Sequence, residues 1–222
     1  MKTFNSQICY RGSFVDTWTQ DQIKNEPMFF NCDLDFAYNN GGPITRAFLR
    51  ALPDDWEGTK ENPVVLDSRV HMLMPGWTPC IPGWHHDDVP RGGVTNQPIY
   101  DGTCKADHIM GLVNGDIAAT RFIVGPVTVS EAHSKALVYK EWSQEINAQI
   151  DGEFIPKSAI VSAPSGRLIQ FDCYAFHTGV PAVASGWRWF VRVSRNTERT
   201  KKITNEIRRQ VQVYMQFPEE GW

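Results

Sequence analysis

The chain has 222 residues, of which 41% are hydrophobic and 21% are charged, and its formal net charge is −3. This composition is that of an ordinary globular protein, long enough to bury a substantial core without disulfide or metal staples. The small negative charge excludes a global basic field of the kind that attracts nucleic acid, although it does not exclude a local basic patch.

The cysteines and the hydropathy pattern bear on the cellular compartment. The five cysteines are widely spaced and form no Cys-x-x-Cys pair, so neither a zinc ribbon nor a disulfide framework is indicated. The N-terminus lacks the apolar run of a signal peptide, and no stretch approaches about 20 apolar residues. We therefore expect a soluble, cytoplasmic protein with free thiols and no membrane partner.

The N-terminal part has a mixed pattern in which two helices can be recognised. The segment 17–27 is predicted to be a helix capped by Thr17. Residues 43–53 predict a second helix, in which Ile44 and Phe48 fall on one buried face. The prolines at either end of this segment suit its first turn and its stop.

From residue 64 the hydrophobic pattern changes to period two, which predicts strands. The predicted strands are 64–74, 106–116, 119–130, 158–162, 167–172, 175–180 and 186–194. One helix interrupts them at 134–150, where apolar residues recur every four positions. The tail 210–217 alternates strictly and predicts an extra strand.

Many short strands after a mainly helical beginning are typical of a β-sandwich or barrel flanked by helices. The sequence contains no unit in which a strand leads through a glycine-rich turn into a helix, so a doubly wound nucleotide-binding fold is not indicated. We therefore expect a single domain that is mainly β with flanking helices.

Two histidines followed by two aspartates lie in the segment 83–90. Residues i and i+2 of a strand project to the same face, so either His85 with Asp87 or His86 with Asp88 would point an imidazole and a carboxylate into one space. A second imidazole from a distant strand would complete a triad of two histidines and one carboxylate. Such a triad suits Fe(II) and leaves coordination positions open. The competing interpretation of this segment is an exposed polar turn.

The distant imidazole is predicted to be His177, which lies in a strand-like segment. The next predicted strand carries Arg188 and Arg192, which share parity and therefore face the same side. An arginine is a natural partner for a carboxylate, because its planar fork donates two parallel hydrogen bonds. A metal triad together with an inward-facing arginine could bind a keto acid that chelates iron.

These segments together resemble the Fe(II)/2-oxoglutarate-dependent oxygenases, whose jelly-roll core carries His-x-Asp, a distal His and then an Arg. The segments that carry the resemblance are 69–88, 119–126 and 166–192. The resemblance covers about residues 64–195 and implies a double-stranded β-helix (jelly-roll) catalytic core there. The domain 1–222 would then consist of a helical or mixed N-terminal part (1–63), this core (64–195) and a C-terminal extension (196–222).

The resemblance also implies roles for the site residues. Members of the family often carry Trp-His-x-Asp, which favours His85 and Asp87, with His177, as the Fe(II) ligands. Arg188 would bind the far carboxylate of 2-oxoglutarate, and Arg192 would lie on the substrate side or serve as the alternative anchor. The implied reaction uses O2 and 2-oxoglutarate to oxidise a C–H bond of an unidentified substrate, which is a nucleobase, a small metabolite or a protein side chain.

Two other functions are compatible with the same residues. One is a cupin-like jelly roll that binds a ligand or a metal without oxygenase activity, and the other is a metal-dependent hydrolase or isomerase that uses no keto acid. The basic run from residue 195 to 209 gives weak support for a nucleic-acid partner, since such a run is usually a solvated face. His71, His108 and His133 have no partner at ligand spacing, so we expect structural or surface roles for them. The sequence does not indicate an oligomeric state.

Overall fold

The computed structural model of the chain describes residues 1–92, 97–131 and 137–215. The described part is mainly β. Its strands are β1 (Lys2–Ser6), β2 (Ile8–Ser13), β3 (Met28–Phe30), β4 (Val64–Leu73), β5 (Arg91–Gly92), β6 (Gln97–Pro98), β7 (Asp107–Val113), β8 (Thr120–Ile123), β9 (Gly125–Val129), β10 (Ile160–Ser162), β11 (Arg167–Asp172), β12 (His177–Gly179), β13 (Gly186–Arg195) and β14 (Glu206–Arg208). Its α-helices are α1 (Gln20–Lys24), α2 (Leu34–Asn40), α3 (Pro43–Arg50) and α4 (Val138–Asp151).

A five-stranded antiparallel sheet, which we call the major sheet, has the order β2-β11-β7-β13-β4. The two ten-residue strands β13 and β4 pair along their whole length, from Gly186 opposite Leu73 to Arg195 opposite Val64. Because side chains of a strand alternate between its two faces, this register determines which residues of β13 and β4 share a face.

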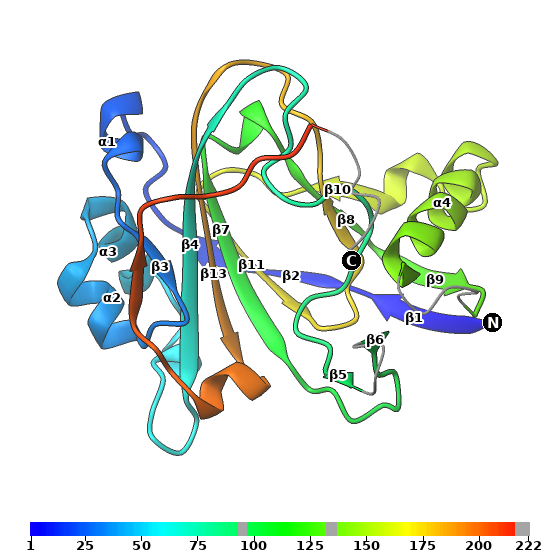
Figure 1. The fold of residues 1–222 in the computed structure, drawn as a ribbon, viewed down its shortest axis with the longest axis horizontal. Helices are drawn as coiled ribbons and strands as arrows, with labels where there is room; N and C mark the ends of the chain where they lie inside the picture. Colours follow the sequence, from blue (N-terminus) through cyan, green and yellow to red (C-terminus); the bar gives the residue numbers. More distant parts are fainter. Residues whose placement is uncertain (93–96, 132–136, 216–222) are drawn as a thin grey trace.

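The outer face of the major sheet is covered by α1, α2 and α3, which lie together on one side of it (Figure 1). Apolar residues of β4 and β13 at alternate positions pack there against Ile44 and Phe48 of α3. The ring of Phe48 lies 6.0 Å from that of Trp189, edge to face. Burial of these residues explains the period-two pattern of the strands and the spacing of the apolar residues in α3.

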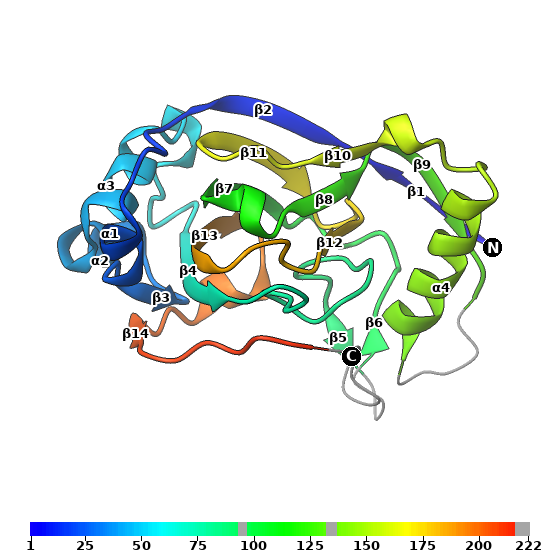
Figure 2. The same cartoon turned by 90° about the horizontal axis from the view of Figure 1, so that it is seen from above.

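A smaller sheet, which we call the minor sheet, has the order β10-β8-β12. Figure 2 shows it between the major sheet and α4. Its Phe122 packs with residues of β7 and β11 in one cluster, which joins the two sheets. Helix α4 packs through Trp142 and Ile146 on a second cluster at the far end of the molecule. The described strands do not close into a barrel.

Two predictions about local elements are wrong. The first helix is capped by Thr19, not by Thr17: the Thr19 hydroxyl accepts a hydrogen bond from the backbone N–H of Gln22 at 3.2 Å, and the Gln22 side-chain oxygen accepts one from the backbone N–H of Thr19 at 2.9 Å. The tail is not a strand over residues 211–215, because its only ladder contact there joins Tyr214 to Thr78. Its alternate residues Val211 and Val213 pack against apolar clusters instead, and residues 216 and 217 lie outside the described part.

The sequence pattern also missed elements of the N-terminal part. Strand β1 pairs with β9, and β2 forms an edge of the major sheet beside β11.

All five cysteines are free thiols. No helix in the described ranges is both long and apolar enough to cross a bilayer.

Candidate metal centre and its cavity

Two histidines from distant parts of the chain face each other in a short antiparallel bridge. The backbone N–H of His85 donates to the carbonyl of His177 at 3.0 Å, and the N–H of His177 donates to the carbonyl of His85 at 3.2 Å. The bridge extends the minor sheet beyond β12 and brings the two rings to 4.4 Å between their centres. The sequence-predicted pairing of these two histidines is thus a direct cross-strand contact.

Both rings are oriented by a backbone carbonyl two residues earlier. The His85 Nδ1 lies 2.8 Å from the carbonyl oxygen of Gly83, and the His177 Nδ1 lies 3.0 Å from that of Ala175. A carbonyl only accepts, so each Nδ1 donates its proton there, and each Nε2 is the ring atom left to bind a metal. Gly83 has φ of 114°, a conformation that other residues rarely adopt, and this turn aims its carbonyl at the ring.

Asp87 supplies a carboxylate to the same point. Its Oδ2 lies 3.1 Å from the Nε2 of His177, and ligand atoms of His85, Asp87 and His177 all lie within 4.8 Å of one another. Two cis donors at bonds of about 2.1 Å would be about 3 Å apart, so this separation fits a shared metal ion. Burial opposes ionisation of Asp87, but the Arg192 guanidinium together with His177 and His85 outweighs burial and holds the pKa of the carboxyl well below its usual range.

The neutral state of His85 also fits metal binding. Burial, followed by the proximity of His177, lowers the pKa of His85 to about 4. An imidazole must be unprotonated to coordinate a metal, so the ring is in its ligand form at neutral pH.

The alternative pair, His86 with Asp88, points elsewhere. His86 is buried in the aromatic cluster next to α4, where its ring lies 3.9 Å from that of Phe176 and its Nδ1 lies 2.9 Å from the Tyr100 hydroxyl. Asp88 has φ of 52° and turns its carboxylate towards Arg199, 3.6 Å away. Of the two sets that the spacing allowed, the described structure brings only the first one to His177.

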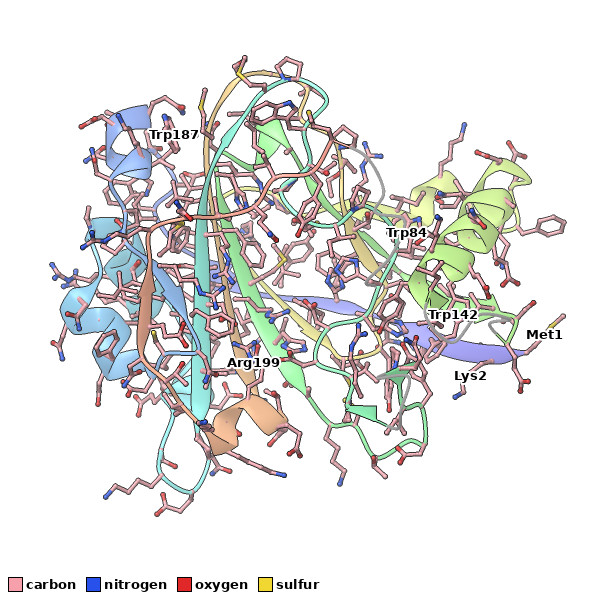
Figure 3. The ribbon with its side chains drawn as sticks, viewed as in Figure 1. Met1, Lys2, Trp84, Trp142, Trp187 and Arg199 are labelled. Carbon is pink, nitrogen blue, oxygen red and sulfur yellow. The ribbon has the colours of Figure 1, made fainter. Side chains whose placement is uncertain are left out.

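The segment that carries these residues is held in place by α4. The Trp84 Nε1 donates to the side-chain oxygen of Asn147 at 3.0 Å, and the Ser143 hydroxyl donates to the Trp84 carbonyl at 3.2 Å. Trp84 and Trp142 are labelled beside this helix in Figure 3. The helix thus positions the residue directly before His85.

The two arginines of β13 lie on the same face of the sheet, as predicted, but their surroundings differ. Arg192 forms ion pairs with Asp87, with Asp67 at 3.7 Å and with Asp88 at 3.8 Å. Burial lowers its pKa, but these three carboxylates outweigh burial and raise it. Arg192 is therefore neutralised by the protein itself.

Arg188 is a buried cation that forms no ion pair with any of the described residues. Its side chain is 1% exposed, its Nη2 donates to the Thr120 hydroxyl at 3.0 Å, and its Nε has no hydrogen-bond partner in the described part of the chain. Burial lowers its pKa to about 10, which leaves the guanidinium charged at neutral pH. An unpaired buried charge is costly, so this site is suited to an anionic ligand.

One cavity of about 1610 Å³ is lined by the three triad residues and by both arginines. Residues 208–214 also line it, and this segment crosses in front of β4 (red in Figure 1). The volume exceeds the range of about 300–1,000 Å³ typical of small-molecule sites, so the cavity has room for more than one small ligand.

Sequence reasoning missed one polar group in this cavity. His71, expected to be structural or on the surface, is 2% exposed, lines the cavity and lies opposite Arg188 in the β4–β13 register. Burial, followed by the charge of Arg188, lowers its pKa to about 3. The sequence could have indicated this position, because Asp67, Arg69 and His71 alternate along β4 and so form a polar row on the face opposite its apolar residues. His108 is buried and hydrogen-bonded to Ser194 at 2.9 Å, and His133 lies outside the described residues.

Comparison with known proteins gives likenesses only to solved structures. No family model matches the chain, and no curated protein does. The non-heme monooxygenase ThoJ in complex with nickel is 11% identical, with a TM-score of 0.40, over 87% of this chain and 74% of ThoJ. HygX from Streptomyces hygroscopicus with nickel and 2-oxoglutarate bound is 9% identical, with a TM-score of 0.43, over 87% of this chain and 84% of HygX.

A third structure is an N-substituted L-amino acid dioxygenase from Burkholderia ambifaria in complex with α-ketoglutarate. It is 13% identical, with a TM-score of 0.36, over 66% of this chain and 57% of that chain. The similar structures thus include non-heme monooxygenases and dioxygenases. At these identities and TM-scores they establish no family for the chain.

Proposed function

We propose that the chain is an Fe(II)- and 2-oxoglutarate-dependent oxygenase that oxidises a C–H bond of its substrate. One observation carries the proposal: a triad of two pre-oriented imidazoles and a carboxylate shares a cavity with a buried arginine that has no counter-ion in the described part of the chain. Two histidines and a carboxylate on one face suit Fe(II) and leave positions for a chelating cosubstrate. The unpaired arginine provides the charge that such a dianion needs.

In this proposal His85, Asp87 and His177 hold Fe(II). With 2-oxoglutarate bound, the metal would supply the oxidative decarboxylation of the keto acid by O2 and the coupled oxidation of the substrate. The carbonyls of Gly83 and Ala175 keep each Nε2 directed at the metal. Arg192 keeps Asp87 ionised, so the third ligand does not have to lose a proton.

Arg188 anchors the far carboxylate of 2-oxoglutarate. Its remaining donors face a cavity that also reaches the triad, and Thr120 holds one end of the guanidinium in place. Arg192 is the weaker candidate, because an incoming carboxylate would have to displace the three that already surround it. The neutral ring of His71 lies next to Arg188 and can donate a hydrogen bond to the same carboxylate.

The fold class that accompanies this function is a double-stranded β-helix with the metal between the major and minor sheets. The pairing of His85 with His177 at the edge of the minor sheet supports this arrangement. The division into residues 1–63, 64–195 and 196–222, with the middle part as catalytic core, remains a prediction of the sequence, as does the cytoplasmic location.

The proposal is tested by an anaerobic titration of the metal-free protein with Fe(II) and then with 2-oxoglutarate, followed in the visible spectrum. We expect a weak charge-transfer band that appears only when both are present. Iron binding without the band would favour a metal site that uses no keto acid, such as a cupin-like binding module. Absence of iron binding would remove the basis of the proposal.

A further inference from the structure

A second arginine of the cavity forms no ion pair with an acidic residue among those that the structure describes. Arg69 lies on β4 between Asp67 and His71, in the polar row that faces the cavity. Its Nη1 donates to the carbonyls of Phe29 at 3.0 Å and of Ser68 at 2.7 Å. No ion pair of Arg69 occurs within the described ranges, and Asp67 acts on its charge without a direct contact.

Three guanidinium groups gather around the ring of Phe30. Their central carbons lie 5.7 Å (Arg69), 5.6 Å (Arg199) and 3.6 Å (Arg208) from the ring centre. Each such contact is a cation–π attraction to the ring. These attractions offset the repulsion between the three positive charges. Burial lowers the pKa of Arg69, and although Asp67 opposes this effect, the neighbouring arginines add to it. An anion bound here would relieve this repulsion.

The carboxylates nearby are already engaged. Arg199 pairs with Asp67 and lies 3.6 Å from Asp88. Arg208 faces Glu206 at 3.7 Å, where both side chains are exposed to solvent. Among the residues that the structure describes, eight lysines and arginines but five aspartates and glutamates line the cavity, although the chain is negative overall. Positive charge is therefore concentrated in the cavity.

This cluster is connected to the candidate metal centre. Asp87 pairs with Arg192, Arg192 lies near Asp67, and Asp67 pairs with Arg199 beside Phe30. Arg199 is labelled in Figure 3. Phe30, Arg69 and Arg208 line the same cavity as the triad, so an anion bound at Phe30 would share that cavity with the metal.

We propose that Arg69 and Arg208 form a binding site for the oxyanion group of a small organic substrate, a carboxylate, sulfate ester or phosphate ester. Arginine binds each of these groups through paired hydrogen bonds. The inference rests on the proposed oxygenase for the fate of the substrate, but the anion site itself requires neither metal nor 2-oxoglutarate. The inference restricts the candidate substrates to anions. It also places the substrate's charged group at a different site from the Arg188 site that would bind 2-oxoglutarate.

The test is a calorimetric titration of the full-length, metal-free protein with phenyl phosphate, phenyl sulfate and benzoate, with uncharged benzyl alcohol as the control probe. We expect at least one anionic probe to bind and benzyl alcohol not to bind. Arg69→Gln should weaken that binding about 10-fold or more, since a charge-assisted contact is lost. Arg208→Gln should have a similar effect, and because the Arg208 side chain is 39% exposed this variant carries less risk to the fold.

Two further variants decide whether the site is the one proposed. Arg167→Gln alters an arginine outside the cavity that stacks on Tyr10, and it should leave binding unchanged. If Arg188→Gln abolished binding while Arg69→Gln and Arg208→Gln retained it, the anion site would be the proposed cosubstrate anchor and the inference would be wrong. Equal binding by all variants, or none by the wild type, would also overturn it. A failed iron titration with intact anion binding would instead contradict only the proposed oxygenase.

Discussion

The adjacent residues His85 and His86 are both buried, yet they have different surroundings. His85 faces His177 and Asp87, whereas His86 packs on Phe176 within the aromatic cluster. Adjacent residues of an extended segment point to opposite sides, so one serves the cavity and the other serves the core. Mutation should therefore separate metal binding from stability at these two positions.

We expect His85→Ala to abolish binding of Fe(II), because one of three donors is lost. His86→Ala should retain the metal but lower the free energy of unfolding by about 3 kcal/mol, as is usual when a large buried side chain is truncated. Metal titration and urea unfolding of both variants measure the two effects. Loss of metal binding in a folded His86→Ala protein would move the ligand set by one residue.

Arg188→Gln tests the cosubstrate anchor. Glutamine can still donate to Thr120 but lacks the charge, so the apparent affinity for 2-oxoglutarate should fall about 100-fold while Fe(II) affinity stays nearly unchanged. The two affinities are measured in the same anaerobic titration. An unchanged requirement for 2-oxoglutarate would transfer the role to Arg192 or contradict the cosubstrate itself.

At the scale of elements, α4 is the support of the ligand segment. It contacts Trp84 through Asn147 and Ser143, and Trp84 directly precedes His85. The same helix carries Trp142, whose Nε1 donates to the Ser130 carbonyl at 2.9 Å, away from the ligands. These two tryptophans therefore form a matched pair for mutation.

We predict that Trp84→Phe and Trp142→Phe each lower the free energy of unfolding by about 1 kcal/mol, the usual net value of one hydrogen bond. Only Trp84→Phe should also weaken metal binding, by about 10-fold, because groups that orient the ligands affect affinity to this extent. Thermal unfolding and metal titration give the two quantities. Equal metal affinity in both variants would show that α4 does not position the site.

The elements that sequence predicts well here are those with a strong apolar period. β4, β13 and α3 were predicted because burial on one face leaves a regular pattern, and the faces of Arg188 and Arg192 followed from it. β1 and β2 were missed because both are rich in polar residues and lie at sheet edges. The tail was wrongly predicted to be a strand because residues can alternate in burial on a surface without pairing with a neighbouring strand.

For the molecule as a whole, the buried imidazoles make stability depend on pH. The pKa of His71 is lowered to about 3 and that of His108 to about 4, in both cases mainly by burial. Both pKa values lie below the unfolded value of about 6.5, so the unfolded chain binds more protons and stability falls as pH drops below 6.5. The loss continues until the folded pKa values are reached.

Between pH 7 and pH 5 each of these two groups should reduce the free energy of unfolding by about 2 kcal/mol. His71→Leu removes one titrating group, so the loss over this interval should shrink by about that amount. Denaturant titrations of both proteins at the two pH values test this expectation. The same pH dependence in wild type and variant would show that His71 does not contribute.

The charge arrangement of the candidate site was largely beyond the sequence. Spacing predicted the triad and left two choices, which differ only in the side of the segment they face. The network that joins Asp67, Asp87, Arg192 and Arg199 depends on which strands become neighbours, and no local pattern encodes that. His71 was hidden for the same reason, since its neighbour Arg188 comes from a distant strand.

The backbone pairing of His85 with His177 has a consequence for how the protein matures. The metal ligands meet only when the middle and the end of the chain have paired, so a nascent chain that still lacks His177 has no complete site. Metal capture must then follow the long-range strand pairing, which is a slow kind of folding event. If the proposed Fe(II) binds only the native state, it would also stabilise that state according to its availability, so survival of the folded protein would depend on the supply of iron.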